Sequence, residues 1–119
     1  SILAEFAGSP MAAFVVACHR SHGISEFRAR SLCVAAIVDR LQQLAVPHLV
    51  IESRHDDRED QVAISRARRS EPSLVWEHRP GAEEPLLWIA DGITWAVGAG
   101  PGWRELIRPI LVEVIELRP

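Results

Sequence analysis

The stretch "HLVIESRHDDRED", residues 48 to 60, joins a strand to a helix and decides the fold class. Its first part, residues 48–53, is a short apolar, β-branched run of the kind that forms a buried parallel strand. Asp56 and Asp57 follow at the place of a helix N-cap, and further acids fill the first turn, where they suit the helix dipole. The stretch therefore predicts a buried strand followed by a capped helix.

The flanking sequence repeats this alternation of strand and helix. Apolar runs predict strands at about 12–18 and 73–78, and helical spacing predicts helices over 25–45 and 85–97. The run "PILVEVIEL", residues 109–117, favours a final strand over a helix. Because parallel strands need a crossover connection, we expect the strands at 12–18, 48–53 and 73–78 to pair in parallel in one sheet with covering helices.

The helix over residues 25–45 shows an apolar stripe and a start signal. Ser25 is the expected N-cap. The expected core-facing side chains are Phe27, Val34, Ile37, Val38, Leu41, Leu44 and Ala45.

Length and charge limit the function classes. The chain has 119 residues, which predicts a single α/β domain over 1–119, and a net charge of −3, which offers no global basic field for nucleic acid. No apolar run approaches the ~20 residues of a membrane span, and no signal peptide is recognisable. Two cysteines, Cys18 and Cys33, make no disulfide framework. We expect a cytoplasmic protein with reduced thiols and no membrane partner.

The most apolar segment, "PLLWIADGITWAVGAG" at residues 85–100, contains one acid, Asp91. On a helical wheel Asp91 falls opposite the face expected to pack on the sheet, with Trp88 and Trp95 on either side of it. An apolar wall makes a lone carboxylate costly unless it meets a cation or a donor. The sheet-facing side chains are expected to be Leu86, Ile89, Ala90, Ile93 and Val97. The alternative is an exposed face, or an Asp91 that bonds an arginine.

Glu52 is the second candidate acid, because ligands collect beyond the carboxyl ends of parallel strands and Glu52 ends the strand at 48–53. Glu52 and Asp91 together predict a site for Mg²⁺ or Mn²⁺ with oxygen ligands. The alternative is an ion pair of Glu52 with Arg54 or Arg79. Zinc is not favoured: "CHRSHG", with Cys18, His19 and His22, has no standard ligand spacing, and His48, His55 and His78 are isolated.

Two of these segments carry a resemblance to a known family. "HLVIESRHDDRED" followed by "EPLLWIADGITWAVGAG" resembles the C-terminal part of bacterial DUF3800-type proteins of an actinobacterial-like branch. The resemblance implies a ribonuclease H-like fold and a metal-dependent nuclease, with Glu52 and Asp91 as catalytic and metal-binding residues and nucleic acid as the substrate.

One part of that family pattern has no counterpart here. The family opens with a three-stranded meander that carries an aspartate, so the resemblance implies that the chain corresponds to the C-terminal part of a longer ribonuclease H-like domain. We therefore expect a homo-oligomer, or contact with the missing N-terminal segment, along a sheet edge or an apolar face. Two functions follow: a metal-dependent nuclease, incomplete or inactive in this chain, or a non-catalytic protein-binding or scaffold module of the same fold.

Overall fold

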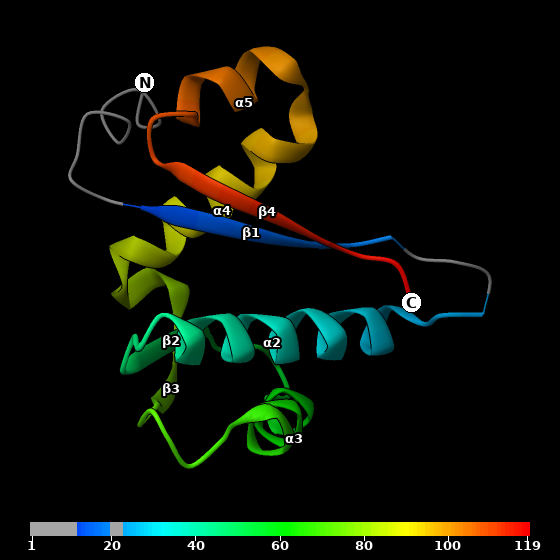
Figure 1. Ribbon diagram of the computed structural model, residues 1–119, viewed down its shortest axis with the longest axis vertical. Helices are drawn as coiled ribbons and strands as arrows, with labels where there is room; N and C mark the ends of the chain where they lie inside the picture. The colour runs from blue at the N-terminus through cyan, green and yellow to red at the C-terminus, as the bar shows by residue number, and fades with distance from the viewer. Residues whose placement is uncertain (1–11, 20–22) are drawn as a thin grey trace. The chain divides into compact units, whose positions relative to one another are not determined.

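A computed structural model of the chain describes residues 12–19 and 23–119. Within these residues the chain is mixed α/β, with four α-helices and two small parallel sheets (Figure 1). The strands are β1 (Ala13–Cys18), β2 (His48–Glu52), β3 (Val75–Arg79) and β4 (Leu111–Leu117). The helices are α2 (Glu26–Gln43), α3 (Arg58–Ala67), α4 (Pro85–Ala99) and α5 (Pro101–Ile107), with a short 3₁₀ turn, η1 (Gly81–Glu83).

The chain forms two compact units. Of the described residues, unit 1 contains those from 12 to 15 and Glu84–Ile115, and unit 2 contains those from 16 to 83 and Glu116–Pro119, so that the boundary crosses both β1 and β4. The single domain expected from the length, and its ribonuclease H-like topology, remain predictions.

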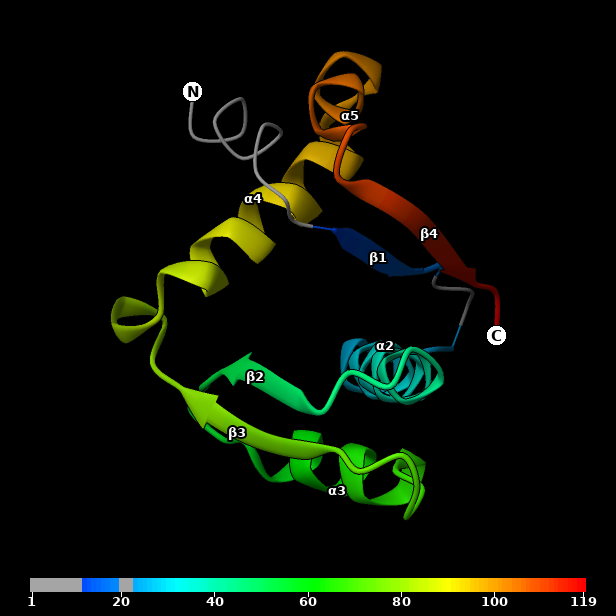
Figure 2. The same ribbon diagram turned by 60° about the vertical axis from the view of Figure 1, so that its left-hand side comes forward.

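The parallel pairing of the second and third predicted strands is confirmed. β2 and β3 run in parallel, in a register from His48 opposite Val75 to Glu52 opposite Arg79 (Figure 2). The connection between them is α3, as a parallel pair requires. Both strands thus end at the same edge of this small sheet.

The expectation of one sheet containing the strand at 12–18 is wrong. β1 pairs with β4 in a separate two-stranded sheet. The two strands run in the same direction, since the amide of Ala13 bonds the carbonyl of Ile110 at 2.7 Å and that of His19 bonds Leu117 at 2.8 Å. Val15 of β1 is buried in the core of unit 1, and Leu111 of β4 packs against the same core, so that burial favours β4 as the partner.

Helix α2 begins and ends as its sequence dictates. The Ser25 hydroxyl accepts a hydrogen bond from the backbone N–H of Arg28 at 3.1 Å, which confirms the predicted N-cap. At the other end, the N–H of Val46 bonds the carbonyl of Leu41 and that of Ala45 bonds Gln42, the pair of bonds that defines a Schellman motif. Ala45 has a φ of 55° and occupies the position where such motifs usually carry glycine.

The core of unit 2 lies between its two helices and the β2–β3 sheet. Its buried apolar residues are Val34, Val38, Ala63, Ile64 and Leu74. The predicted α2 stripe is confirmed for Val34 and Val38. It is wrong for Phe27, Leu44 and Ala45, which are exposed, because Phe27 lies in the first turn of α2 and the other two lie past its last residue, Gln43.

A polar side chain is buried at the end of α2. Gln42 is only 1% exposed. Its amide nitrogen donates to the carbonyls of Arg69 and Pro72, both at 2.8 Å, and its oxygen accepts from the N–H of Arg69 at 2.9 Å. The side chain of Gln42 thus provides hydrogen-bond partners for backbone groups of the loop at residues 69–72. Buried backbone groups need such partners.

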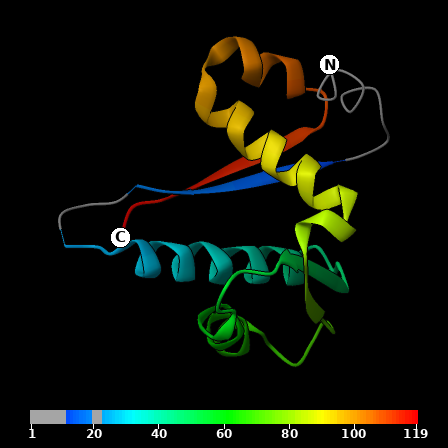
Figure 3. The same ribbon diagram turned by 180° about the vertical axis from the view of Figure 1, so that it is seen from behind.

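The core of unit 1 is built from Val15, Ile93, Ala96, Ile107 and Ile110, and Figure 3 shows how the chain turns between α4 and α5. The predicted sheet-facing side of α4 is confirmed for Ile93, and for Ile89 and Val97, which pack against this core. It is wrong for Leu86 and Ala90, which are exposed, because the face in contact is centred on Ile93 and Ala96.

Candidate functional site

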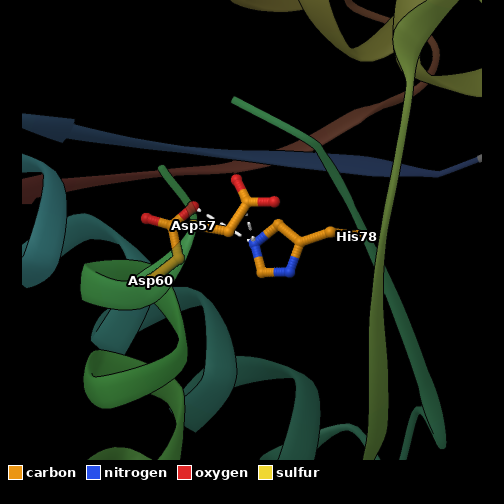
Figure 4. Close-up of side chains that lie close together, drawn as sticks. All are labelled: Asp57, Asp60 and His78. Carbon is orange, nitrogen blue, oxygen red and sulfur yellow. Dashed lines mark hydrogen bonds and ion pairs between the residues drawn. The ribbon is translucent and has the colours of Figure 1, made fainter. Parts of the chain in front are cut away.

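Three ligand-type side chains converge in unit 2. Asp57, Asp60 and His78 each direct one potential ligand atom into a space where those atoms lie within 4.8 Å of one another (Figure 4). The Nε2 atom of His78 lies 3.4 Å from Oδ2 of Asp60 and 3.9 Å from Oδ1 of Asp57. Among the described residues, these three form the group of ligand-type side chains that lie close enough together to hold a metal ion.

Strand alternation places His78. Side chains two residues apart share a face of a strand, so His78 lies on the same face of β3 as Trp76. Trp76 packs against the core of unit 2, which includes Ala63 and Ile64 of α3. His78 therefore points toward α3, and its side chain is 10% exposed.

The turn between β2 and α3 places Asp57. The sequence predicts that its carboxylate caps α3. In the structure the carboxylate makes no cap hydrogen bond and turns back toward the end of β2. There it accepts hydrogen bonds from the Ser53 hydroxyl and from the backbone N–H of Arg54, both at 2.7 Å. Asp56 instead bonds the first N–H of the helix, that of Arg58, at 3.0 Å. Asp56 thus caps the start of α3, and Asp57 is held facing the end of β2.

Helix α2 supplies the counter-charge of Asp60. The Arg30 guanidinium donates to both carboxylate oxygens of Asp60, from Nε at 2.9 Å and from a terminal nitrogen at 2.8 Å. The Asp60 side chain is only 5% exposed, whereas that of Arg30 is 36% exposed. Two parallel bonds of this kind fix the carboxylate in position.

The electrostatics favour two ionised carboxylates. Burial raises the pKa of Asp60, but the hydrogen bonds and charge of Arg30, together with His78, outweigh it and leave the pKa below its ordinary value. For Asp57, the bonds from the Arg54 N–H and the Ser53 hydroxyl lower the pKa. Both groups are therefore anionic near neutral pH, which is the form that binds a cation.

These donors fit a divalent ion. Ligands bound to one ion at about 2.0–2.2 Å lie roughly 3–4 Å apart, and the two distances from His78 to the carboxylates fall in this range. The bonds from Arg30 leave lone pairs free on Asp60, because a carboxylate offers about four acceptor sites. Carboxylate with imidazole is a ligand set that suits Zn²⁺ and Mn²⁺.

The two acids predicted from the sequence lie elsewhere in the fold. Glu52 ends β2 in unit 2, and its carboxylate rests against Gly81 so closely that any side chain at Gly81 would collide with it. Asp91 is exposed on α4 in unit 1, where Trp95 packs edge-to-face on Trp103, with ring centroids 4.9 Å apart. Neither acid belongs to the three-residue cluster, and the Glu52–Asp91 pair stays a prediction.

The cysteine and histidine motif "CHRSHG" is only partly described. His19 pairs with Glu116 at 3.2 Å, and Cys18 and Cys33 are free thiols. Burial raises the pKa of the Cys33 thiol. His22 lies outside the described residues.

Comparisons of the chain with protein-family models, curated proteins and solved structures found no significant match. The resemblance to DUF3800-type proteins therefore stays a prediction. No helix in the described part of the chain combines the length and apolar character that crossing a membrane demands.

Proposed function

We propose that this chain is a divalent-metal-binding domain with Asp57, Asp60 and His78 as ligands, and that the ion serves phosphodiester hydrolysis. The convergence of the three side chains at one end of the β2–β3 pair is the observation that carries the metal site. The reaction class is suggested by the sequence resemblance alone.

The neighbouring residues act as positioning groups. Ser53 and the Arg54 N–H hold the Asp57 carboxylate, and Arg30 holds that of Asp60, so that both face His78. Fixed ligands bind an ion without first losing side-chain freedom. A bound divalent ion would polarise a phosphoryl oxygen and lower the pKa of a water molecule.

The imidazole narrows the choice of ion. Of Mg²⁺ and Mn²⁺, the two ions expected from the sequence, Mg²⁺ prefers oxygen ligands throughout. Mn²⁺ accepts an imidazole more readily, and Zn²⁺ binds such mixed sets more tightly still. We therefore expect the affinity to rise from Mg²⁺ through Mn²⁺ to Zn²⁺.

Thermal unfolding with added ions tests the site. Millimolar Mn²⁺ or micromolar Zn²⁺ should raise the melting temperature of the native chain. At an ion concentration about 100 times Kd, binding should add about 2.7 kcal/mol to the free energy of unfolding. Asp57→Asn and His78→Gln should abolish the rise. Asp56→Asn is the matched control, because that carboxylate faces Arg58 instead of the cluster. An unchanged melting temperature with all three ions would refute the metal site.

The same proteins test the reaction. Cleavage of labelled single- and double-stranded oligonucleotides should depend on Mn²⁺ and disappear in Asp57→Asn. Metal binding without cleavage would leave the metal site standing and remove the nuclease.

A non-catalytic scaffold is the second candidate, and the two bonds between Arg30 and Asp60 favour it. They balance the buried charge of Asp60 without any ion. This candidate predicts that no divalent ion binds, while Arg30→Met still destabilises the fold.

A further inference from the structure

A groove runs along α2 and α3 on residues that the metal site does not use. Its floor is apolar: Phe27, Leu32 and Ala35 come from α2, and Val62 and Ala63 from α3. Phe27 is 66% exposed and Val62 48%, so two large apolar side chains of this floor meet solvent. Adjacent exposed apolar side chains framed by polar ones mark interaction sites.

The rim of the groove is basic, although the chain as a whole carries a net charge of −3. Arg28, Arg58 and Arg66 line the groove with a single acid, Glu59. Arg58 is paired with Asp56, whereas no carboxylate of the described residues pairs with Arg28 or Arg66. The unpaired positive charge of the rim is therefore contributed by one arginine of each helix.

The geometry points to an acidic amphipathic helix of a partner protein as the occupant of this groove. A helix that presents apolar residues at i, i+3, i+4 and i+7 fills an apolar groove of this kind. Acidic residues on its flanks would meet Arg28 on one helix and Arg66 on the other. The site thus selects its partner by two features, an apolar stripe and negative flanks.

Two other occupants fit less well. In a symmetric dimer formed through this groove, each copy would place its basic rim against that of the other, and like charges repel. A nucleic acid would satisfy the arginines but would leave the aliphatic floor around Leu32 and Val62 uncovered. The inference is independent of the metal proposal, because none of Asp57, Asp60 and His78 lines the groove.

Fluorescence anisotropy with designed peptides tests the inference on the full chain. The probe is a labelled helix of about 15 residues, near the length at which isolated helices become stable, with leucine at the four stripe positions and mostly glutamate elsewhere. Its controls have the same composition in scrambled order, and lysine in place of glutamate. The acidic helix should bind at least about tenfold more tightly than either control, a difference of about 1.4 kcal/mol. Equal binding of the three peptides, or of none, would overturn the inference.

Variants assign the binding to this groove. Phe27→Ser and Val62→Ser should each weaken binding of the acidic helix about tenfold, as expected for truncation of a central apolar contact. Leu44→Ser is the matched control, because Leu44 is an exposed residue at the end of the same helix but does not line the groove. The double variant Arg28→Glu with Arg66→Glu should prefer the lysine peptide. An unchanged peptide preference in that variant would contradict the proposed role of the arginines.

Three further measurements separate the other occupants. Phe27→Ser should leave the melting temperature as unchanged as Leu44→Ser does, and a large loss would show that the chain itself covers the groove. Light scattering should give the same mass for Phe27→Ser and the native chain, whereas a native dimer lost in the variant would identify a second copy as the occupant. Binding of a labelled single-stranded RNA that is lost in Phe27→Ser would identify nucleic acid. Each of these contrary results overturns the inference.

Discussion

In unit 2 two polar side chains, Gln42 and Asp60, are buried beside the apolar core, whereas every buried side chain described in unit 1 is apolar. An apolar contact is satisfied by any side chain of suitable size and shape. A buried amide or carboxylate needs particular partners, and here these are a loop backbone and Arg30. The unit whose buried side chains need specific polar partners is therefore also the unit that holds the candidate metal cluster.

The largest effect is expected in the apolar core of unit 1. Replacing Ile93 with Ala removes a side chain that is 5% exposed and should lower the free energy of unfolding by about 2–5 kcal/mol. Leu86→Ala, on the same helix but at an exposed position, should change it by less than about 0.5 kcal/mol. Urea unfolding measures both, and equal losses would show that the α4 face is assigned wrongly.

A polar replacement in unit 2 should come next. Gln42→Leu introduces an apolar side chain of similar size, which leaves three backbone groups of the 69–72 loop without their hydrogen-bond partner. We expect a loss of about 2–4 kcal/mol, since each buried unsatisfied group costs about 1–3 kcal/mol and water can reach part of the loop. The control is Gln43→Leu, the exposed neighbour, which should be nearly neutral. A stable Gln42→Leu would remove the contrast between the two units.

The ion pair of unit 2 should have a smaller effect. Arg30→Met leaves the buried Asp60 without its cation, and we expect a loss of about 1–3 kcal/mol at pH 7 in EDTA. This is below the 3–5 kcal/mol typical of fully buried pairs, because Arg30 itself is partly exposed.

This loss should also depend on pH. The folded pKa of Asp60 lies below its ordinary value of about 3.9, so the folded state holds the proton more weakly than the unfolded chain. The stability that comes from the charged carboxylate is therefore present above pH ~3.9 and is lost as the pH falls through the lower folded pKa. Urea titrations of the native chain and of Arg30→Met should converge on acidification. A constant difference would contradict the assigned charge.

The smallest effect is expected at Asp91 in unit 1. Because this carboxylate is exposed, Asp91→Asn should change the free energy of unfolding by less than about 0.5 kcal/mol. If the cluster in unit 2 binds the ion, Asp91→Asn should also leave the shift of the melting temperature by Mn²⁺ unchanged. Loss of that shift in Asp91→Asn, but not in Asp57→Asn, would instead support the pair of acids expected from the sequence.

The sequence predicted local structure well and strand partners less well. The Ser25 cap, the strand at 48–53 and its parallel pairing with the strand at 73–78 follow from local patterns and from the crossover rule. The pairing of β1 with β4 does not, because an apolar strand carries no mark of which other apolar strand it will meet.

The candidate site shows the same limit at the level of side chains. In the sequence, Asp57 stands at the place of a helix cap, Asp60 stands in the first turn where it suits the helix dipole, and His78 is an isolated histidine. The register places His78 opposite Ile51, close to where β2 ends, and only the backward turn of Asp57 completes the set. A signal did exist for Gln42, since it continues the i, i+4 series of Val34 and Val38 on the buried stripe.

The left-handed residue that closes α2 has a consequence for how this protein tolerates variation. The side chain of Ala45 is exposed, but the backbone φ of 55° at this position disfavours every residue with a Cβ. A saturation library at position 45 should therefore rank glycine first, with asparagine near alanine, and place valine, isoleucine and threonine last. A few residues away, at exposed positions inside α2 such as Asp39, glycine should instead be among the poorest choices.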